Sequence, residues 1–383
     1  MIIRNGLTFI AEEGFVKKDV EFIGEKITRV ADVLDNPNND VEYDATGQYV
    51  LPGFIDAHSH IGLFNEAMRW EGEDGNEMSD PVTPDMQAID GINPQDSGFE
   101  DALNGGVTTA CTGPGSANVV GGSFTTISLY GDVVDKMIIQ HPAAMKCAFG
   151  ENPKGCYGQN GRKAPMTRMG VAAILRDTLT KAENYIAKKE DAEFKGNHFD
   201  IDTKMEAMIP VIQKEIPLKA HAHRADDICT AIRVAKEFGL KLTLEHCTEG
   251  HFIADYIVEN ELYAQVGPTF GSKSKIELRN ISFETAKILN EKGVKVSIIT
   301  DHPVIPQGSL NMCAALAVKA GMDVNEAIKA ITVNPAEALG IDHLKGAIRE
   351  GLDADIVIWD REPLDLQAKT LRVYVCGEEV FGR

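Results

Sequence analysis

The chain lacks the features that mark several broad classes of protein. No apolar run approaches the roughly 18 residues of a membrane-spanning helix, and the first residues include acidic side chains where a signal peptide has an apolar core. The seven cysteines form no C-x-x-C pair, and their odd number leaves one over, so we interpret them as reduced thiols. These absences predict a cytoplasmic protein without a membrane partner.

Positive charge is also in short supply. Against 58 acidic residues the sequence has only 38 lysines and arginines, which gives a formal net charge of -20. Such a field repels phosphate backbones, so we expect no nucleic-acid partner. The composition is otherwise that of a globular protein, with 43% hydrophobic and 25% charged residues. A chain of 383 residues is long enough to bury about three quarters of its unfolded surface.

Both ends of the chain have the pattern of antiparallel β-strands. Short alternating apolar stretches, broken by turn signals such as Asn5-Gly6, fill residues 1–50. The same pattern returns in 347–383, in the segments ADIVIWD and LRVYVCGEEVF. Two short β segments cannot each bury a face alone. We therefore expect both termini to pair in one small β-sandwich.

Residues 51–346 alternate strand-like apolar runs with amphipathic helices, which indicates a parallel β/α architecture. Helices are expected around 99–104, over 171–189 and over 226–239. Seven strands are clear, and a weak eighth is expected between Phe194 and Thr203. The count predicts a (β/α)8 TIM barrel.

Imidazole and carboxylate groups stand at the ends of four of these strands. His58 and His60 close the first strand, His221 and His246 close two later ones, and Asp301 closes VSIIT. In a closed barrel the C-terminal strand ends meet at one rim, where such barrels place their active sites. Imidazole nitrogen and carboxylate oxygen are ligands that zinc and similar cations take. The pattern therefore predicts a metal site.

With these motifs the chain resembles the amidohydrolase superfamily, specifically its branch of imidazolonepropionase-related amidohydrolases. The resemblance runs in the family order through LPGFIDAHSH (51–60), GVTTACTGPGS (106–116), HAHRADD (221–227), LEHC (244–247), TDHP around Asp301, VNPAEALGI and GLDADIVIWD. It implies a (β/α)8 barrel beside a small β-sandwich built from both termini. It also implies a hydrolase that depends on one or two divalent metal ions, with zinc expected first and manganese or iron as alternatives.

The resemblance further implies a role for each strand-end residue. His58, His60, His221 and His246 are expected as metal ligands. Asp301 is expected as both a metal ligand and the catalytic proton shuttle.

Members of the family with two ions bridge them with a carboxylated lysine or a glutamate, and the strand AAMKCAFGEN offers Lys146 and Glu151. The two lie five positions apart, so alternation points them to opposite faces, and Lys146 lies about 16 Å deeper in an extended strand. We favour Glu151 as the bridge or a direct ligand. Lys146, and a single-ion site that uses neither, are the alternatives, and Glu151 can also be a carboxylate that only caps the following turn.

Further residues near the predicted rim are candidates for contact with substrate. His223 shares the strand-end face of His221 and is interpreted as a catalytic or substrate-contacting group, against a packed rim residue. Cationic groups near the rim suit a substrate carboxylate. The candidates are Lys154, Tyr157, Arg162, Arg168 and Arg224, against the alternative of surface charges that balance acidic neighbours.

Two other segments are distinctive. Residues 64–97 carry nine acidic side chains against one basic, Arg69, which is typical of a solvated loop, or else of a lid or a contact in a homo-oligomer, the assembly we expect. The glycine-rich stretch 113–122 lacks the third glycine and the acidic partner of a dinucleotide loop, so we predict a long β/α loop near the site.

The sequence thus supports the hypothesis of a hydrolase that cleaves an amide, cyclic amide, N-acyl or peptide C–N bond in a small, carboxylate-bearing molecule. Metal-activated water would attack, with Asp301 moving the proton. A deaminase of aminated heterocycles is the alternative, although HAHRADD lacks the glutamate that such members carry soon after this histidine. A catalytically silent scaffold is a third reading, disfavoured because all five ligand positions are present.

Overall fold

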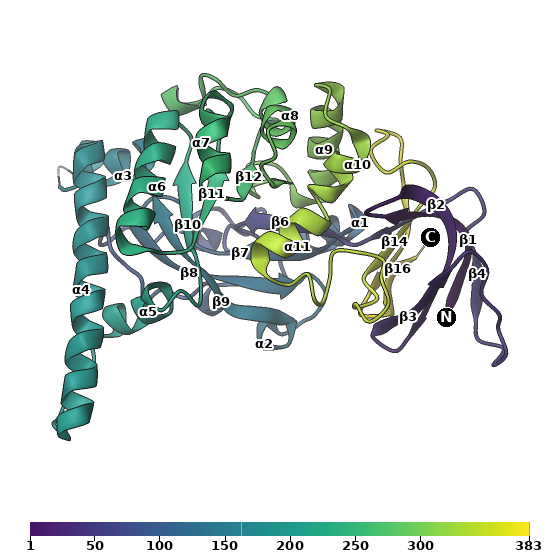
Figure 1. Cartoon of the computed structure of the whole chain (residues 1–383), viewed down its shortest axis with the longest axis horizontal. Helices are drawn as coiled ribbons and strands as arrows, with labels where there is room; N and C mark the ends of the chain where they lie inside the picture. Colours follow the sequence, from purple (N-terminus) through teal and green to yellow (C-terminus); the bar gives the residue numbers. More distant parts are fainter. Residues whose placement is uncertain (162, 383) are drawn as a thin grey trace.

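The computed structural model describes residues 1–161 and 163–382, in which the strands form two eight-stranded sheets. The sheet that contains β6 to β13 and most of the helices forms the larger body, and the other sheet lies at one end of the molecule, where both termini meet (Figure 1). Each body has its own cluster of buried apolar side chains. The expected combination of a barrel with a β domain from both termini is confirmed.

The terminal sheet joins strands that lie some 300 positions apart in sequence, in the order β16-β15-β14-β5-β1-β2-β3, with β4 beside β1. β14 runs antiparallel to β5, with Ile356 opposite Pro52 and Trp359 opposite Tyr49. The predicted pairing of the two termini is therefore confirmed. The strands are β1 (Ile2–Ile10), β2 (Gly14–Ile23), β3 (Lys26–Ala31), β4 (Glu42–Asp44), β5 (Tyr49–Pro52), β14 (Ile356–Trp359), β15 (Thr370–Val375) and β16 (Glu378–Gly382).

The barrel sheet has the order β6-β7-β8-β9-β10-β11-β12-β13. Parallel pairing joins β6 to β7 and links β9 through β13, and these include all seven of the clearly predicted strands. The strands are β6 (Phe54–Ser59), β7 (Val107–Thr112), β8 (Val120–Ser128), β9 (Ile138–Ala148), β10 (Leu218–Ala222), β11 (Leu242–His246), β12 (Ala264–Val266) and β13 (Val296–Ile298).

The prediction of an eighth strand between Phe194 and Thr203 is wrong. α4 continues to Lys195 and α5 begins at Thr203, where the Asp202 carboxylate caps the helix. The eighth strand is β8, which runs antiparallel between β7 and β9. An antiparallel strand needs no crossover helix, so the alternation of strand and helix in the sequence gave no sign of it.

Helices lie along the outside of the barrel sheet (Figure 1). α1 and α6 confirm two expected helices, and α4 extends beyond the predicted 171–189, with one end projecting from the body. The helices are α1 (Ser97–Asn104), α2 (Val134–Met137), α3 (Glu151–Pro153), α4 (Arg168–Lys195), α5 (Thr203–Ile212), α6 (Ala225–Phe238), α7 (Ala254–Glu259), α8 (Glu284–Glu291), α9 (Leu310–Lys319), α10 (Val324–Lys329) and α11 (Val333–Leu339). Among the described residues, none of the helices combines the length and apolarity needed to cross a membrane.

Backbone hydrogen bonds join the end of the first barrel strand to the segment after the last. The Asp301 amide donates to the His58 carbonyl over 3.3 Å, and the His60 amide donates to the His302 carbonyl over 3.0 Å. The buried Asp56 carboxylate on β6 also accepts from the Thr300 amide at 3.3 Å. These contacts place Asp301 next to the histidines of β6.

Candidate metal centre

Two groups of ligand-type side chains lie at the C-terminal ends of the barrel strands. The first cluster consists of His58, His60 and Asp301, and the second cluster consists of His221, His223 and His246. Within each cluster the potential ligand atoms lie within 4.8 Å of one another. The rings of His58 and His246 are 5.2 Å apart, so the clusters adjoin.

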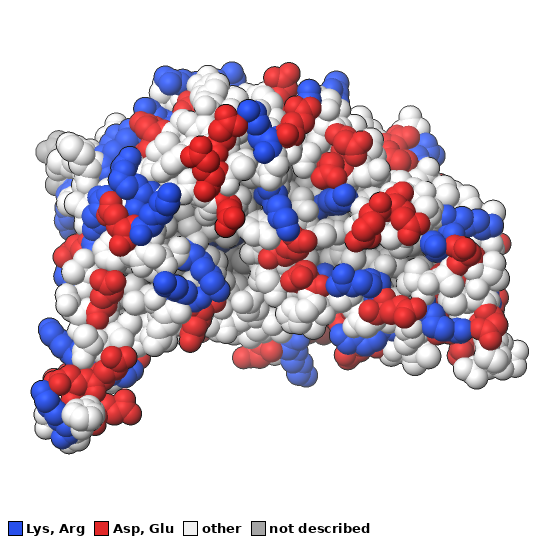
Figure 2. Space-filling view, viewed as in Figure 1, with Lys and Arg blue, Asp and Glu red and all other residues white. Residues whose placement is uncertain are grey.

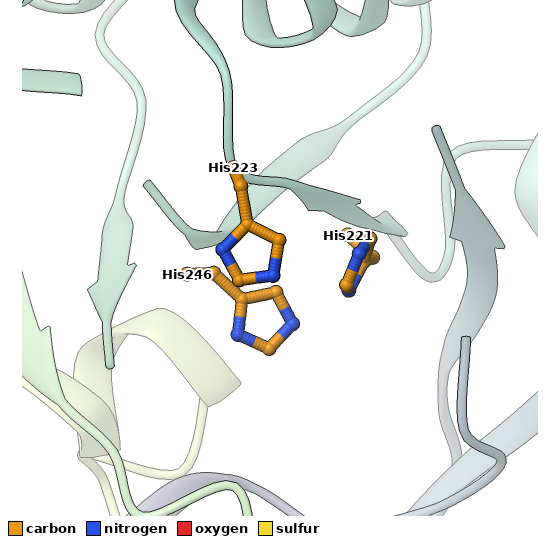
Figure 3. Close-up of side chains that lie close together, drawn as sticks. All are labelled: His221, His223 and His246. Atoms are coloured by element: carbon orange, nitrogen blue, oxygen red, sulfur yellow. The ribbon is translucent and has the colours of Figure 1, made fainter. Parts of the chain in front are cut away.

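Figure 3 shows the second cluster, in which the rings of His223 and His246 are nearly parallel and His221 stands across them. The His223 and His246 centroids are 4.6 Å apart, and the His221 and His246 centroids are 4.5 Å apart. The prediction that His221 and His223 share a face agrees with this geometry.

The backbone turns sharply where two of these side chains leave their strands. His246 has φ of 70° and Asp301 has φ of 55°, both in the left-handed region that non-glycine residues avoid. Such a conformation costs about 1–3 kcal/mol and persists only where the surroundings hold it, most often at functional sites.

The rings of the first cluster are oriented by acceptors. His58 Nδ1 lies 2.8 Å from Glu245 Oε2, and His60 Nδ1 lies 2.6 Å from the Gly113 carbonyl oxygen. Because a carbonyl oxygen only accepts, His60 donates through Nδ1 and keeps a lone pair on Nε2. The close contact of His58 Nδ1 with the Glu245 carboxylate favours the same tautomer for His58. Those Nε2 atoms lie 3.3 and 3.2 Å from Asp301 Oδ1, a third acceptor. Three lone pairs thus converge on one point, which a cation between them would stabilise.

The carboxylate behind His58 is part of a buried chain. Glu245 Oε2 lies 3.0 Å from Lys219 Nζ, which donates to Gln265 Oε1 over 2.8 Å, and Thr243 Oγ1 donates to Glu245 Oε1 over 2.7 Å. Burial alone would raise the pKa of Glu245, but Lys219 and His58 bring it down to about 2. Glu245 therefore stays ionised and fixes the His58 ring, as carboxylates behind metal-binding histidines do.

Neutral partners orient the second cluster. His246 Nδ1 donates to the Gly267 carbonyl over 2.8 Å, while His221 Nδ1 lies 2.9 Å from Ser116 Oγ and His223 Nδ1 lies 2.8 Å from Thr248 Oγ1. Burial lowers the pKa of all three rings, for His246 to about 3. The Nε2 atom of His246 is buried without a hydrogen-bond partner. This cluster therefore offers uncharged nitrogen donors.

The loop that follows β7 reaches both clusters, as predicted for the stretch 113–122. The prediction of a β/α loop is wrong, because the segment connects β7 to the antiparallel β8 and its last residues, Val120 to Gly122, belong to β8. The loop supplies the Gly113 carbonyl to His60 and the Ser116 hydroxyl to His221. At Gly113 a Cβ atom would lie 2.3 Å from the Phe124 ring, so only glycine allows this close approach.

Lys146 reaches the histidines from below. Its side chain is fully buried, and Nζ lies 3.4 Å from His58 Nε2 and 5.4 Å from the centroid of the Phe124 ring. Burial lowers the pKa of this amine to about 8. Lys146 stands opposite Lys219 in the sheet, and its long side chain makes up the difference in depth.

Glu151 lies outside both clusters. Gly150, with φ of 82°, turns the chain out of β9, and Glu151 begins α3. Its Oε2 accepts from the Glu277 amide over 3.4 Å, and its own amide donates to Glu277 Oε2 over 3.0 Å. The structure thus brings Lys146, and not Glu151, to the imidazoles.

Glu277 and Lys275 lie beside the second cluster but were not predicted from the sequence. Glu277 Oε1 lies 3.6 Å from His221 Nε2, 3.8 Å from His223 Nε2 and 2.7 Å from Lys275 Nζ, and its side chain is fully buried. Burial would raise the pKa of Glu277, but His223 and Lys275 lower it below the usual value. The residue sits in η5 (Ile276–Leu278), after β12, and the only available signal was that this strand also ends at the rim.

Two of the three arginines among the substrate candidates, Arg168 and Arg224, pair with nearby acids. Arg168 Nε lies 2.9 Å from Asp227 Oδ1, and Arg224 binds Asp226 through two contacts of 2.9 and 2.8 Å. Acidic and basic side chains are interspersed over the face drawn in Figure 2. These pairs agree with the charge-balancing alternative more closely than with a guanidinium fork aimed at the clusters.

The remaining candidates lie in the loop after β9. The Tyr157 hydroxyl is 2.6 Å from Asn118 Oδ1 and 2.9 Å from the Asp80 carbonyl, so it joins this loop to the acidic segment 64–97. That segment also runs beside β8 through bridges at Val82 and Gln87. Lys154 begins η3 (Lys154–Asn160), and Arg162 lies outside the described residues.

The model of the amidohydrolase family matches residues 49–380 of this chain. The chain belongs to the amidohydrolase family. A solved amidohydrolase from Thermotoga maritima MSB8 is 43% identical, with 100% of both chains covered and a TM-score of 0.97. The match confirms the resemblance and the barrel fold.

Two curated relatives of this amidohydrolase are more distant. The amidohydrolase tasK of Hapsidospora irregularis is 26% identical over 371 residues, which cover 90% of this chain. The chain spans only 38% of the length of tasK. An imidazolonepropionase from Picrophilus torridus is 24% identical over 376 residues, which cover 94% of this chain and 91% of the relative.

Proposed function

We propose that the protein is a metal-dependent hydrolase that cleaves an amide-type C–N bond in a small, carboxylate-bearing molecule. The observation that carries the proposal is the first cluster, where His58 Nε2 and His60 Nε2 lie 3.3 and 3.2 Å from Asp301 Oδ1. The Lys146 amine contacts His58 Nε2 alone, at 3.4 Å, so the three acceptors share no common donor among the described side chains. Because burial lowers the pKa of His58, protonation of that ring does not readily supply the missing hydrogen between these acceptors. A divalent cation fits the donor set, with zinc expected first.

The two clusters define where ions would be held. The first cluster would hold one ion, and in a two-ion enzyme His221 and His246 would hold the second. When bound, such a cation would lower the pKa of water to about 7 and polarise the carbonyl of the substrate. The protein side chains supply the remaining functions.

Asp301 is the proposed proton shuttle. Its side chain is 14% exposed, the largest exposed fraction in the first cluster, although Oδ1 itself is buried. Although burial would raise its pKa, His246 and the other neighbouring imidazoles hold the pKa of Asp301 well below the usual value, which leaves a carboxylate to accept the proton of the attacking water. The Asp301 carboxyl group can then pass that proton to the leaving nitrogen.

We propose Lys146 in place of Glu151 as the bridging group. Lys146 Nζ lies 3.4 Å from His58 Nε2, whereas the Glu151 carboxylate accepts from the Glu277 amide instead. Carboxylation requires a neutral amine, and burial lowers the pKa of Lys146 to about 8, which leaves about a tenth of it neutral at pH 7. The carboxylated side chain would supply the negative charge that the second cluster lacks.

Metal analysis together with a substrate screen tests this function. We expect one or two transition-metal ions per chain in the purified protein, and turnover of members of a panel of N-acyl amino acids, dipeptides and cyclic amides by the zinc- or manganese-loaded enzyme. The double substitution His58→Ala and His60→Ala should remove at least one ion. Unchanged metal content in that variant would rule out the site.

A deaminase is the second candidate, and one observation favours it. Glu277 places a buried carboxylate 3.8 Å from His223 Nε2, although the motif HAHRADD contains no glutamate. It could therefore take the part of a proton donor from another strand end. Release of ammonia from aminated heterocycles, lost in Glu277→Gln, would favour the deaminase over the amide hydrolase.

A further inference from the structure

A second cavity lies at the opposite end of the barrel from the metal clusters. It has a volume of about 430 Å³ and is bounded by the N-terminal parts of β9 to β12 and by the end of α11. The clusters stand at the C-terminal ends of the same barrel. This space, which we call the lower cavity, is therefore separate from the site described above.

Phe124 of β8 separates the lower cavity from the metal centre. Its ring centroid lies 5.3 Å from that of His58 on one side. Its side chain packs in one cluster with Ala143 and Ala144, which line the lower cavity. Access to the two spaces is consequently from opposite ends of the barrel.

The inner end of the lower cavity presents hydrogen-bond donors. Gln265 is fully buried and lines the cavity, its Oε1 accepts from Lys219 Nζ, and its Nε2 has no hydrogen-bond partner. A buried amide donor without a partner costs about 1–3 kcal/mol. Lys219 also lines the cavity and is 1% exposed. An oxygen acceptor, above all a carboxylate, suits this end.

The mouth of the lower cavity has the opposite character. Glu215, Glu261 and Glu337 line it together with a single lysine on the exposed surface, Lys241, and Glu337 also pairs with Lys295 outside the cavity. The rest of the lining includes leucines at 240, 242 and 262. It also includes Thr243, Tyr263 and Gln140, whose Oε1 is buried without a hydrogen-bond partner. The mouth therefore favours a cation, and the leucines favour an aliphatic chain.

We propose that the lower cavity binds an ω-amino carboxylate or a basic amino acid, with its carboxylate at Gln265 and Lys219 and its terminal ammonium at the glutamates of the mouth. Glu261 lies in the turn before β12, with φ of 53°, and precedes Gln265 by four residues, so at most about 13 Å of chain joins the two. Within that limit, a ligand whose two charges are separated by a short chain of methylene groups can reach both ends of the cavity.

A ligand in the lower cavity has a physical route to the metal centre. Gln265 contacts Lys219, Lys219 contacts Glu245, and Glu245 holds His58. A carboxylate that shares the Lys219 ammonium leaves Glu245 less neutralised, so Glu245 pulls harder on the His58 Nδ1 proton. His58 Nε2 then becomes the stronger donor, and the ion bound there should leave more slowly. This second effect, but not the binding itself, rests on the proposed metal site.

Calorimetric titration of the full-length protein with 6-aminohexanoate tests the binding. Hexanoate and hexylamine each lack one of the two charges and serve as matched probes. We expect 6-aminohexanoate to bind and each singly charged probe to bind at least tenfold more weakly. Equal affinity for all three, or no binding of 6-aminohexanoate, would overturn the proposal.

Substitutions locate the bound probe. Ala338→Trp fills the mouth from α11, and Glu261→Lys reverses a charge at an exposed position of the mouth. Each variant should weaken the binding of 6-aminohexanoate at least fivefold. Leu366→Trp, at a side chain that is 79% exposed and lies outside the cavity, should leave the binding unchanged. In the metal-free protein Asp301→Asn should leave the affinity unchanged, because the coupling acts only through an ion bound at the metal centre. Binding that survives both cavity variants, or that is lost in Asp301→Asn, would contradict the assignment. None of these measurements requires turnover, so they stand whether or not the proposed hydrolase activity is found.

The coupling has its own measurement. Release of zinc to a chelator should slow at least threefold when 6-aminohexanoate is bound, and Gln265→Leu should abolish the slowing. An unchanged rate in the presence of bound 6-aminohexanoate would refute the coupling while leaving the binding site in place.

Discussion

The first and second clusters lie side by side yet differ in charge and in what holds their rings. The first contains the Asp301 carboxylate and is backed by the ionised Glu245. The second consists of three imidazoles held by a carbonyl and two hydroxyls. If the proposed metal site is right, the first cluster should bind a cation unaided, whereas the second should depend on negative charge from Glu277 or from a carboxylated Lys146.

The largest expected effect comes from the one carboxylate within a cluster. Asp301→Asn should lower kcat by at least 10²–10⁴-fold, because the variant loses the proton carrier and a charged ligand. The melting temperature should change little. Asp226→Asn, at a side chain 52% exposed, is the matched control and should keep normal kcat. A near-normal kcat for Asp301→Asn at saturating metal would refute the proposed hydrolysis.

The next largest effect is a loss of metal affinity that should be confined to the first cluster. Glu245→Gln weakens the hold on His58 and should reduce metal affinity there by about 10–100-fold, with the ion of the second cluster retained. Since Lys219 loses a buried partner, some loss of stability is also expected, and unfolding by denaturant measures it separately. Glu259→Gln, on the exposed surface of α7, provides the control. Equal loss from both clusters would erase the contrast between them.

Lys146→Met and Glu151→Gln form a matched pair for the second cluster. We expect Lys146→Met to remove one of two ions and Glu151→Gln to remove none, by metal analysis after dialysis. The reverse result would restore Glu151 as the bridge.

Metal uptake that depends on carboxylated Lys146 should also vary with pH. The pKa of Lys146 is lowered to about 8 by burial, so the neutral amine grows as pH rises from 7 to 9. Bicarbonate-stimulated metal uptake should rise over the same range and be absent in Lys146→Met. A folded-state pKa below the unfolded one also means that stability gained from this group increases from about pH 8 toward 10.5. Uptake independent of pH in this window would count against carboxylation.

The smallest effect is expected at Glu277, which stands 3.6 Å from His221 Nε2 without being a member of the cluster. Glu277→Gln removes a charge but keeps the shape, and should weaken metal binding at the second cluster by about fivefold, or about 1 kcal/mol. Zinc titration in competition with a chromophoric chelator would show it. A loss as large as that of a ligand substitution would make Glu277 part of the cluster.

The alternation of strands and helices and the strand-end residues were sufficient to predict the barrel, the terminal sheet and the meeting of His58, His60, His221, His246 and Asp301 at one rim, but not their division into two clusters. β8 was missed because its antiparallel course carries no helix and its sequence, VGGSFTTIS, mixes glycine and threonine with few apolar residues. The rise per residue along β9 predicts Lys146 too far below the rim, because it omits the length of the lysine side chain, which reaches His58. It also omits the turn at Gly150, which carries Glu151 away from the rim.

Contacts between residues of different barrel strands could not be predicted from the sequence for a different reason. Glu245 is adjacent to His246 in the motif LEHC, but its partners His58 and Lys219 come from other strands. Glu277 belongs to a loop without periodicity. Only the closure of the barrel makes such contacts, so spacing along the chain does not encode them.

The pairing of β14 with β5 has a consequence for synthesis of the protein. While the chain emerges, β5 shows an open hydrogen-bonding edge until Ile356–Trp359 has been made, some 300 residues later. Unprotected edges invite pairing with other chains. The terminal sheet is therefore completed late on the ribosome, and a nascent chain halted before β14 is expected to be the form most prone to aggregate.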